Sequence, residues 1–201
     1  MTRFMIFGSG RQGIACADFL LSSFDDTQIC FADRSVTQLQ AALDQLDKPE
    51  RISTFECDIS HDNPQLHIAV SECDCVISCV PYFFNERLAT IALKRKKHFC
   101  DLGGNNTVVE NQLNLDAKAA KAGISIVPDC GLAPGWVNIL AEYWQDQWQY
   151  ESVKIYCGGL PQHPKGIWKY EANFSIHGLI NEYLEDCEIS RGGTLVKIPG
   201  M

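Results

Sequence analysis

Three glycines near the N-terminus have the spacing with which a backbone binds a phosphate. Residues 8–13 are Gly-Ser-Gly-Arg-Gln-Gly, and they follow an apolar run at 4–7. Gly8 permits a tight turn out of a strand, Gly10 lets a pyrophosphate approach the backbone, and Gly13 lets the next helix pack closely on the sheet. The free N–H groups and the dipole of that helix favour phosphate. We therefore predict a dinucleotide site with contacts from Gly8, Ser9, Gly10, Arg11, Gln12 and Gly13.

An acidic residue lies where the second half of this fingerprint requires one. Residues 27–32 predict a second strand, and Asp33 follows it, twenty residues beyond the last glycine. A carboxylate there accepts the ribose hydroxyls and repels a 2′-phosphate, which favours NAD. Arg34 could bind that phosphate instead, so NADP stays open. The alternative interpretation is that the glycines only join a strand to a helix and that Asp33 caps the next helix.

Further cofactor contacts are expected where two other strands end, because open α/β sheets bind ligands at the carboxyl ends of their strands. Asp58 and Ile59 follow the third predicted strand and are candidate adenine contacts; a simple turn is the alternative. Val80 and Pro81 end the fourth predicted strand. Tyr82 comes next and is a candidate hydrogen-bond donor at the nicotinamide end, with a core position equally open.

Besides Tyr82, three residues are candidates for catalysis. Asp101 ends a strand at the same edge and could hold a substrate amine or act as a base; it could also cap the following helix. Asp129 lies in the loop 128–135, which has two prolines and two glycines, and such rigid loops present groups to ligands. His177 lies on a predicted helix and could face the cleft or the surface. Cys130 is interpreted as pocket lining, with a reactive thiol as the alternative.

The elements that must position these residues alternate in the first two-thirds of the chain. Strands are predicted at 4–7, 27–32, 51–56, 74–80, 98–101 and 124–127, and helices at 14–21, 35–46, 64–71, 84–95 and 107–122. This alternation is typical of a doubly wound parallel sheet. Beyond it we expect helices at 136–148 and 177–184 and antiparallel strands at 153–157, 169–174, 187–190 and 194–198.

The predicted fold class is therefore α/β. A Rossmann domain at 1–130 is followed by the start of an α+β substrate domain at 131–201 with a mixed or antiparallel sheet. The apolar residues of the second domain alternate as one face of a sheet, and too little helical sequence follows to cover that face. We expect this domain to be incomplete and the chain to pair as a homodimer.

The charge, apolar runs and cysteines of the chain indicate which partners and which compartment to expect. The net charge of −8 and the pI of about 5.0 disfavour nucleic acid or an anionic membrane as a partner. No apolar run is long enough to span a bilayer. Several of the ten cysteines lie in apolar runs, and the first strand leaves no room for a signal peptide, so a reducing cytoplasm is expected. Cys73, Cys75 and Cys79 lack the paired spacing of a metal site, and no metal is expected.

Several stretches together resemble the saccharopine dehydrogenase family, most closely its lysine 6-dehydrogenase-like members. The matching stretches are 8–13, 80–82, 101–105, 127–135, 158–162 and 174–183, of which the proline-flanked Asp-Cys-Gly loop and the Gly-Gly-Leu-Pro-Gln stretch are the most specific. The likeness runs the whole length of the chain, whereas the family's chains are nearly twice as long. At position 177 this chain has His where close relatives often have an acid.

The resemblance implies an NAD(P)-dependent oxidoreductase that acts at a C–N bond of an amino acid or polyamine. In the lysine 6-dehydrogenase form, the ε-amine of lysine is oxidised to the semialdehyde with release of ammonia. Two other classes stay open: a nucleotide-sensing module without turnover, and a thiol-dependent semialdehyde dehydrogenase that uses Cys130.

Overall fold

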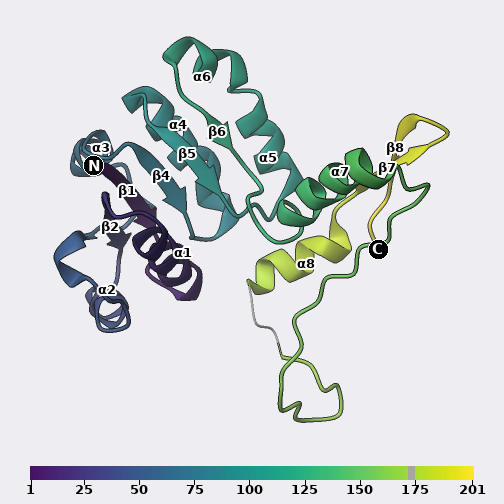
Figure 1. Ribbon diagram of the computed structural model, residues 1–201, viewed down its shortest axis with the longest axis horizontal. Coiled ribbons are helices and arrows are strands. Elements are labelled where there is room, and N and C mark those ends of the chain that lie inside the picture. Colours follow the sequence, from purple (N-terminus) through teal and green to yellow (C-terminus); the bar gives the residue numbers. More distant parts are fainter. Residues whose placement is uncertain (172–174) are drawn as a thin grey trace. The chain divides into compact units, whose positions relative to one another are not determined.

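The computed structural model describes residues 1–171 and 175–201 of the chain. The chain divides into two compact units, Met1–Leu140 and Ala141–Met201. The first unit contains most of the residues predicted to bind or to react, and it is the one in which a layered fold can be followed in Figure 1.

The first unit is built on a parallel sheet of six strands in the order β3-β2-β1-β4-β5-β6 (Figure 1). The strands are β1 (Thr2–Phe7), β2 (Thr27–Asp33), β3 (Ile52–Glu56), β4 (Cys75–Ser78), β5 (His98–Asp101) and β6 (Ile126–Val127). The strand order reverses between β1 and β4, and in such sheets ligands bind at the carboxyl ends of the strands on either side of the reversal. The predicted doubly wound sheet is confirmed.

Helices cover both faces of the sheet because both faces of its central strands are apolar. In β1, Met5 and Phe7 belong to one buried cluster, with α3 (Pro64–Ser71) and α4 (Asn85–Arg95). Ile6 belongs to the other, with α1 (Arg11–Ser23) and α2 (Val36–Leu43). Successive side chains of a strand point to opposite faces, so one short apolar run serves two cores. Short 3₁₀ turns complete the unit at η1 (Pro49–Arg51) and η2 (Tyr82–Phe84).

The long helix expected at 107–122 is instead two helices, α5 (Asn106–Leu113) and α6 (Asp116–Ala122). The break falls at Asn114 and Leu115, whose ψ angles are −8° and −6°. Asn is a poor residue for a helix interior because its side chain competes for nearby backbone groups, whereas Leu115 packs against the core. Periodicity alone therefore missed the interruption. Gly123, at φ 72°, ends α6 in the left-handed conformation, as predicted.

The second unit contains α8 (Ile176–Leu184) and an antiparallel hairpin of β7 (Cys187–Arg191) and β8 (Thr194–Ile198), while α7 (Trp136–Trp148) spans the division between the units. The strand expected at 153–157 is absent, and residues 169–171 are not in a strand; the rest of the strand expected at 169–174 lies outside the described residues. Alternating apolar residues form a strand only when a neighbour pairs with it. No helix in the described part of the chain has the length and apolar character needed to cross a membrane.

Candidate functional site

Two of the three glycines at 8–13 are required by the packing of the protein itself. At Gly8, which has φ 94°, a Cβ would lie 2.7 Å from the carbonyl oxygen of Cys79. At Gly13 a Cβ would lie 1.9 Å from the carbonyl oxygen of Gly8. Gly10 is the N-cap of α1, and a Cβ there would meet no described atom within 4 Å. The open space beside Gly10, at the start of a helix, fits a bound anion.

Asp33 holds this loop from the end of β2. Its Oδ2 accepts hydrogen bonds from the Ser9 amide at 2.9 Å and from Ser9 Oγ at 3.0 Å. Its Oδ1 accepts from the Ser35 amide at 2.9 Å. The N-cap of α2 is Ser35, whose Oγ accepts from the Gln38 amide, so the structure does not use Asp33 as the cap. Asp33 is a half-buried carboxylate that positions the glycine loop.

The loop after β4 lies against the glycine loop on one side and against the loop after β5 on the other. The Val80 side chain lies 3.2 Å from the Cβ position of Gly8. Further along, the Tyr82 Cβ lies 3.2 Å from the Cβ position of Gly104. Pro81 stands between these contacts and precedes η2. Three of the sheet's carboxyl-end loops are therefore in continuous contact.

Asp101 is fully buried at the end of β5, and both of its carboxylate oxygens are used by the fold. Oδ1 accepts from the Gly103 amide at 2.7 Å and from the Asp129 amide at 3.3 Å, and Oδ2 accepts from Gln112 Nε2 at 2.6 Å. The cap of α5 is Asn105, not Asp101. The structure therefore shows Asp101 as the group that joins the loops after β5 and β6.

Gln112 is a residue of this site that the sequence analysis did not identify. It is buried on α5 and donates to Asp101. Its position was detectable, because residues 108, 112, 115 and 119 are spaced as one helix face, and Gln112 is the polar residue among apolar neighbours. A polar side chain in an apolar stripe indicates a buried hydrogen-bond partner.

Asp129 places a second carboxyl group beside Asp101. It adopts φ 59°, and its Oδ1 lies 1.8 Å from the Cβ position of Gly103, which itself has φ 75°. Only a glycine can therefore lie beneath this carboxyl group. Burial, followed by the negative charge of Asp101, raises the pKa of Asp129 above its usual value. A half-buried carboxyl group with a raised pKa is suited to accept a proton from a substrate.

Cys130 is exposed, yet its surroundings hold it in the thiol form. The hydrogen bond with the Cys100 thiol, then burial and the charges of Asp101 and Asp129, raise the pKa of Cys130 well above its usual value. Because the thiolate is the nucleophilic form, this arrangement disfavours a thiol-dependent mechanism at Cys130.

The remaining residues that were predicted to contact the cofactor or the substrate differ in their exposure and in their place in the fold. Asp58 is exposed and accepts from the amide and Oγ of Ser60, which lowers its pKa; the charge of Arg34 contributes in the same direction. Ile59 is buried in the core below α3 and α4. Arg11 and Gln12 are exposed at the start of α1. His177 lies on α8, in the second unit.

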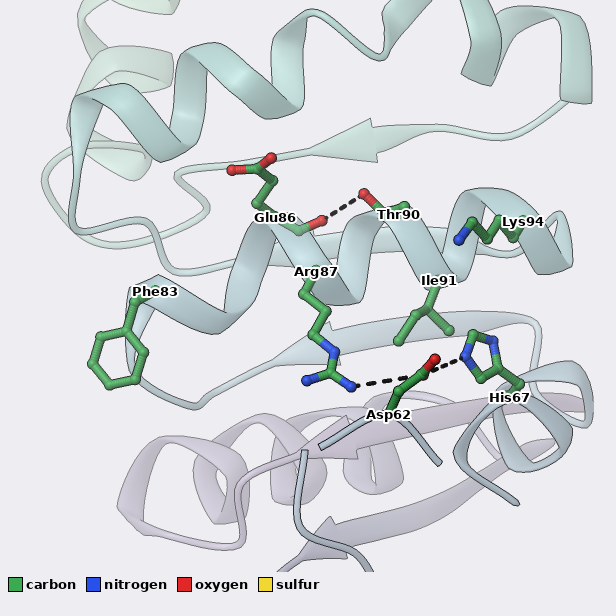
Figure 2. Close-up of a pocket in the computed structure, with 8 residues that line it drawn as sticks. All are labelled: Asp62, His67, Phe83, Glu86, Arg87, Thr90, Ile91 and Lys94. Atoms are coloured by element: carbon green, nitrogen blue, oxygen red, sulfur yellow. Dashed lines mark hydrogen bonds and ion pairs between the residues drawn. The ribbon is translucent and has the colours of Figure 1, made fainter. Parts of the chain in front are cut away.

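A separate surface pocket of about 480 Å³ lies between α3 and α4 (Figure 2). Its lining residues are Asp62, His67, Phe83, Glu86, Arg87, Thr90, Ile91 and Lys94. Figure 2 shows the Asp62 carboxylate between His67 and Arg87, at 3.0 Å and 3.7 Å. None of the predicted cofactor or catalytic residues lines this pocket, so we assign the candidate site to the loops at the sheet edge. Among the described residues, no group of three or more His, Cys, Asp or Glu side chains is arranged to hold a metal ion.

Two family models match the chain in succession. Residues 4–127 match the saccharopine dehydrogenase NADP binding domain, and residues 131–201 match the saccharopine dehydrogenase C-terminal domain.

Curated proteins similar to the chain are considerably longer than it. It is 27% identical over 210 residues to the saccharopine dehydrogenase [NADP(+), L-glutamate-forming] of Schizosaccharomyces pombe, covering 100% of this chain and 44% of that protein. It is 24% identical over 203 residues to the mitochondrial alpha-aminoadipic semialdehyde synthase of Rattus norvegicus, covering 98% of this chain and 21% of that protein.

Nearly the whole chain can be superimposed on a solved structure of a similar protein. The apo saccharopine dehydrogenase (L-Glu forming) of Saccharomyces cerevisiae superimposes with a TM-score of 0.72 at 23% identity, over 99% of this chain and 44% of that chain. This likeness supports the fold of a Rossmann sheet followed by a smaller second unit.

Proposed function

The chain belongs to the saccharopine dehydrogenase family, and we propose that it provides the dinucleotide site of an NADP-dependent oxidoreductase that acts at a C–N bond of an amino acid. The observation that carries this proposal is the contact between the loops after β1, β4 and β5, with open space at Gly10. Saccharopine is our proposed substrate, in preference to free lysine, because the family models and similar proteins are named for saccharopine.

The cofactor would lie along the carboxyl edge of the sheet. The proposed contacts are Gly8, Ser9, Gly10, Arg11, Gln12, Gly13, Asp33, Arg34, Asp58, Ile59, Val80 and Pro81. Amides at the start of α1 would bind the pyrophosphate. When bound, the nicotinamide supplies the hydride acceptor for the substrate carbon.

Binding of NADP is supported by the surroundings of Asp33. Three hydrogen-bond donors already point at its carboxylate, which reduces its repulsion of a 2′-phosphate. The next residue, Arg34, is exposed and its charge reaches Asp58, so its guanidinium is available at the ribose end. The sequence favoured NAD and left NADP open; the structure and the family's NADP binding domain lead us to propose NADP.

For catalysis we propose that Asp129 accepts the proton that the substrate amine loses. Asp101 fixes the loop that presents Asp129, since it accepts the Asp129 amide. Tyr82, against Gly104, is a proposed donor near the reacting carbon, and His177 a proposed substrate contact from the second unit. The functional division into a cofactor domain at 1–130 and a substrate domain at 131–201 is likewise a proposal, and so is a homodimer.

Dinucleotide titration tests the proposal directly. We expect calorimetry to give a dissociation constant for NADP at least tenfold below that for NAD, and we expect Arg34→Ala to remove this preference. Arg191→Ala, at the exposed end of β7, is the matched control and should leave both affinities unchanged. A folded protein that binds neither dinucleotide would contradict the proposal. Saccharopine-dependent reduction of NADP, compared with lysine, then separates an oxidoreductase from a nucleotide-sensing module.

A further inference from the structure

Two cysteine thiols meet beside the proposed dinucleotide loop. Cys16 lies on the second turn of α1, and Cys79 lies directly after β4. Their sulfur atoms are 4.0 Å apart, and both residues are free cysteines that are only partly buried. A disulfide needs a sulfur–sulfur distance of about 2.05 Å, so the two sulfur atoms must come about 2 Å closer before they can bond.

The two thiols have different pKa values. Such a difference favours oxidation of the pair, because one cysteine supplies the thiolate and the other supplies the thiol. The Cys79 thiol donates its hydrogen bond to the Cys16 sulfur. This bond lowers the pKa of Cys16 to about 7, although burial acts in the opposite direction. The same bond raises the pKa of Cys79. Cys16 therefore provides a thiolate at neutral pH, and Cys79 provides the neighbouring thiol.

The two cysteines flank the turn that is expected to hold the pyrophosphate. The Cys79 carbonyl oxygen lies 2.7 Å from the Cβ position of Gly8, and the Cys79 amide donates to Phe7 at 2.8 Å. On the other side, α1 packs on the turn through Gly13, whose Cβ position is 1.9 Å from the Gly8 carbonyl oxygen. A disulfide between Cys16 and Cys79 would link α1 covalently to the loop after β4, on either side of this tightly packed turn.

We propose that Cys16 and Cys79 form a reversible disulfide when the protein meets a peroxide, and that this disulfide weakens dinucleotide binding. The Cys16 thiolate attacks one oxygen of hydrogen peroxide, the O–O bond breaks, and Cys16 becomes a sulfenic acid; the other oxygen leaves as hydroxide, which takes up the proton that Cys16 had released and becomes water. The Cys79 sulfur then attacks the Cys16 sulfur, and the hydroxyl group leaves with the Cys79 proton as a second water. Two thiols are oxidised and one peroxide is reduced. The effect on binding rests on the proposed function, whereas the disulfide does not.

Peptide mapping locates the bond. After peroxide treatment and alkylation of the remaining thiols, cleavage at arginine releases Cys16 in the peptide 12–34 and Cys79 in the peptide 52–87. We expect these two peptides to be cross-linked, and we expect Cys16→Ser and Cys79→Ser each to abolish the cross-link. Cys30→Ser and Cys75→Ser change other cysteines of the same two peptides and are the matched controls, which should retain it.

The second measurement is NADP affinity before and after oxidation. We expect the oxidised protein to bind NADP at least fivefold more weakly, with full recovery in dithiothreitol and no effect of peroxide on Cys79→Ser. A cross-link that survives in Cys16→Ser, or no cross-link when the exposed Cys187 is already oxidised, would overturn the disulfide. A mapped disulfide with unchanged affinity would overturn its effect on binding. If the reduced protein binds no dinucleotide, the proposed function fails together with this effect, and the mapping alone decides the disulfide.

Discussion

At the scale of single residues, the glycines at 8–13 have two different roles. Two of them are required by the packing of the protein, and the third is not. Gly8 and Gly13 are needed because a Cβ at either would strike backbone atoms of the protein itself. Gly10 is not needed by the fold, because a Cβ there would meet open space. A glycine that the fold does not require, at the start of α1, supports our proposal that a dinucleotide phosphate lies beside it.

Gly10→Val should abolish nucleotide binding and leave the fold intact, because the branched side chain would occupy the space that the pyrophosphate needs. We expect the NADP dissociation constant to rise by about a hundredfold or more, equivalent to roughly 3 kcal/mol. Calorimetric titration and circular dichroism measure the two effects. Gly13→Ala is the informative comparison, since its Cβ would collide with Gly8 and should lower the melting temperature. Normal NADP binding by Gly10→Val would show that this loop is not the site.

Asp129→Asn should stabilise the protein at neutral pH while reducing activity. The folded-state pKa of Asp129 is raised, so the folded protein binds a proton there more readily than the unfolded chain does, and stability falls as the pH rises through this range. An amide removes the charge, and Asn also tolerates the positive φ of this position. We expect a melting temperature about 1–3 °C higher at pH 7, a modest gain because the carboxyl group is only half buried.

The pH dependence provides the check on Asp129. The difference between Asp129→Asn and the parent protein should shrink as the pH falls through the raised pKa of Asp129, because the aspartate itself then takes up a proton. Asp25→Asn, at an exposed turn, is the control and should show no such difference. A gap in melting temperature that stays constant with pH would rule out the charge of Asp129 as its cause.

At the scale of elements, α5 contributes more than packing to the site. It supplies the Gln112 amide that holds Asp101 Oδ2, while Asn105 caps its first turn. Asp101 in turn accepts the amides of Gly103 and Asp129, so α5 acts through one buried carboxylate on the loops after β5 and β6. The position of the candidate base Asp129 therefore depends on α5 through Asp101.

Gln112→Leu keeps the side-chain volume and removes the donor, which leaves the buried Asp101 charge with one partner fewer. We expect a loss of about 1–3 kcal/mol in the free energy of unfolding, measured by urea titration. The loss is partly offset, because Gln112 Oε1 has no partner among the described residues. Gln40→Leu removes an exposed amide that bonds Asp44 and should change stability by less than about 0.5 kcal/mol. Equal effects of the two variants would contradict the role assigned to Gln112.

At the scale of the whole molecule, the two units differ in how well they bury their apolar residues. The first unit has two dense clusters, one on each face of its sheet. In the second unit, large apolar side chains such as Tyr156, Ile167 and Trp168 are 84–89% exposed. Exposed apolar residues in such number mark an interaction surface.

We therefore expect this 201-residue chain to self-associate through residues beyond Glu151. Sedimentation velocity should show dimers or larger species at micromolar concentration, and the double substitution of Ile167 and Trp168 by Ser should shift them towards monomer. Phe19→Ser, at a residue of α1 that is 65% exposed, serves as the control and should leave association unchanged. A monomer at every concentration would count against this surface.

Local patterns in the sequence were sufficient to predict most of the first unit. The bounds of α3, β5 and α7 are those expected, and the strand–helix alternation predicted the doubly wound sheet. Glycine spacing and Asp33 also pointed to the carboxyl edge of the sheet, where we propose the dinucleotide site. These features depend on periodicity and turn chemistry within a few residues, which a sequence displays directly. The strand expected at 153–157 failed because pairing needs a neighbour that the alternation does not specify.

Only the tertiary structure decided which groups of the site are already engaged. The sequence left Asp101 open as a substrate-amine contact, a base or a helix cap, and the fold buries it and gives its carboxylate amide donors from three other residues. Likewise, Cys16 and Cys79 are 63 positions apart and meet only because β1 and β4 are neighbours in the sheet. Contacts of this kind depend on strand order and register, and neither can be deduced from the spacing of side chains along the sequence.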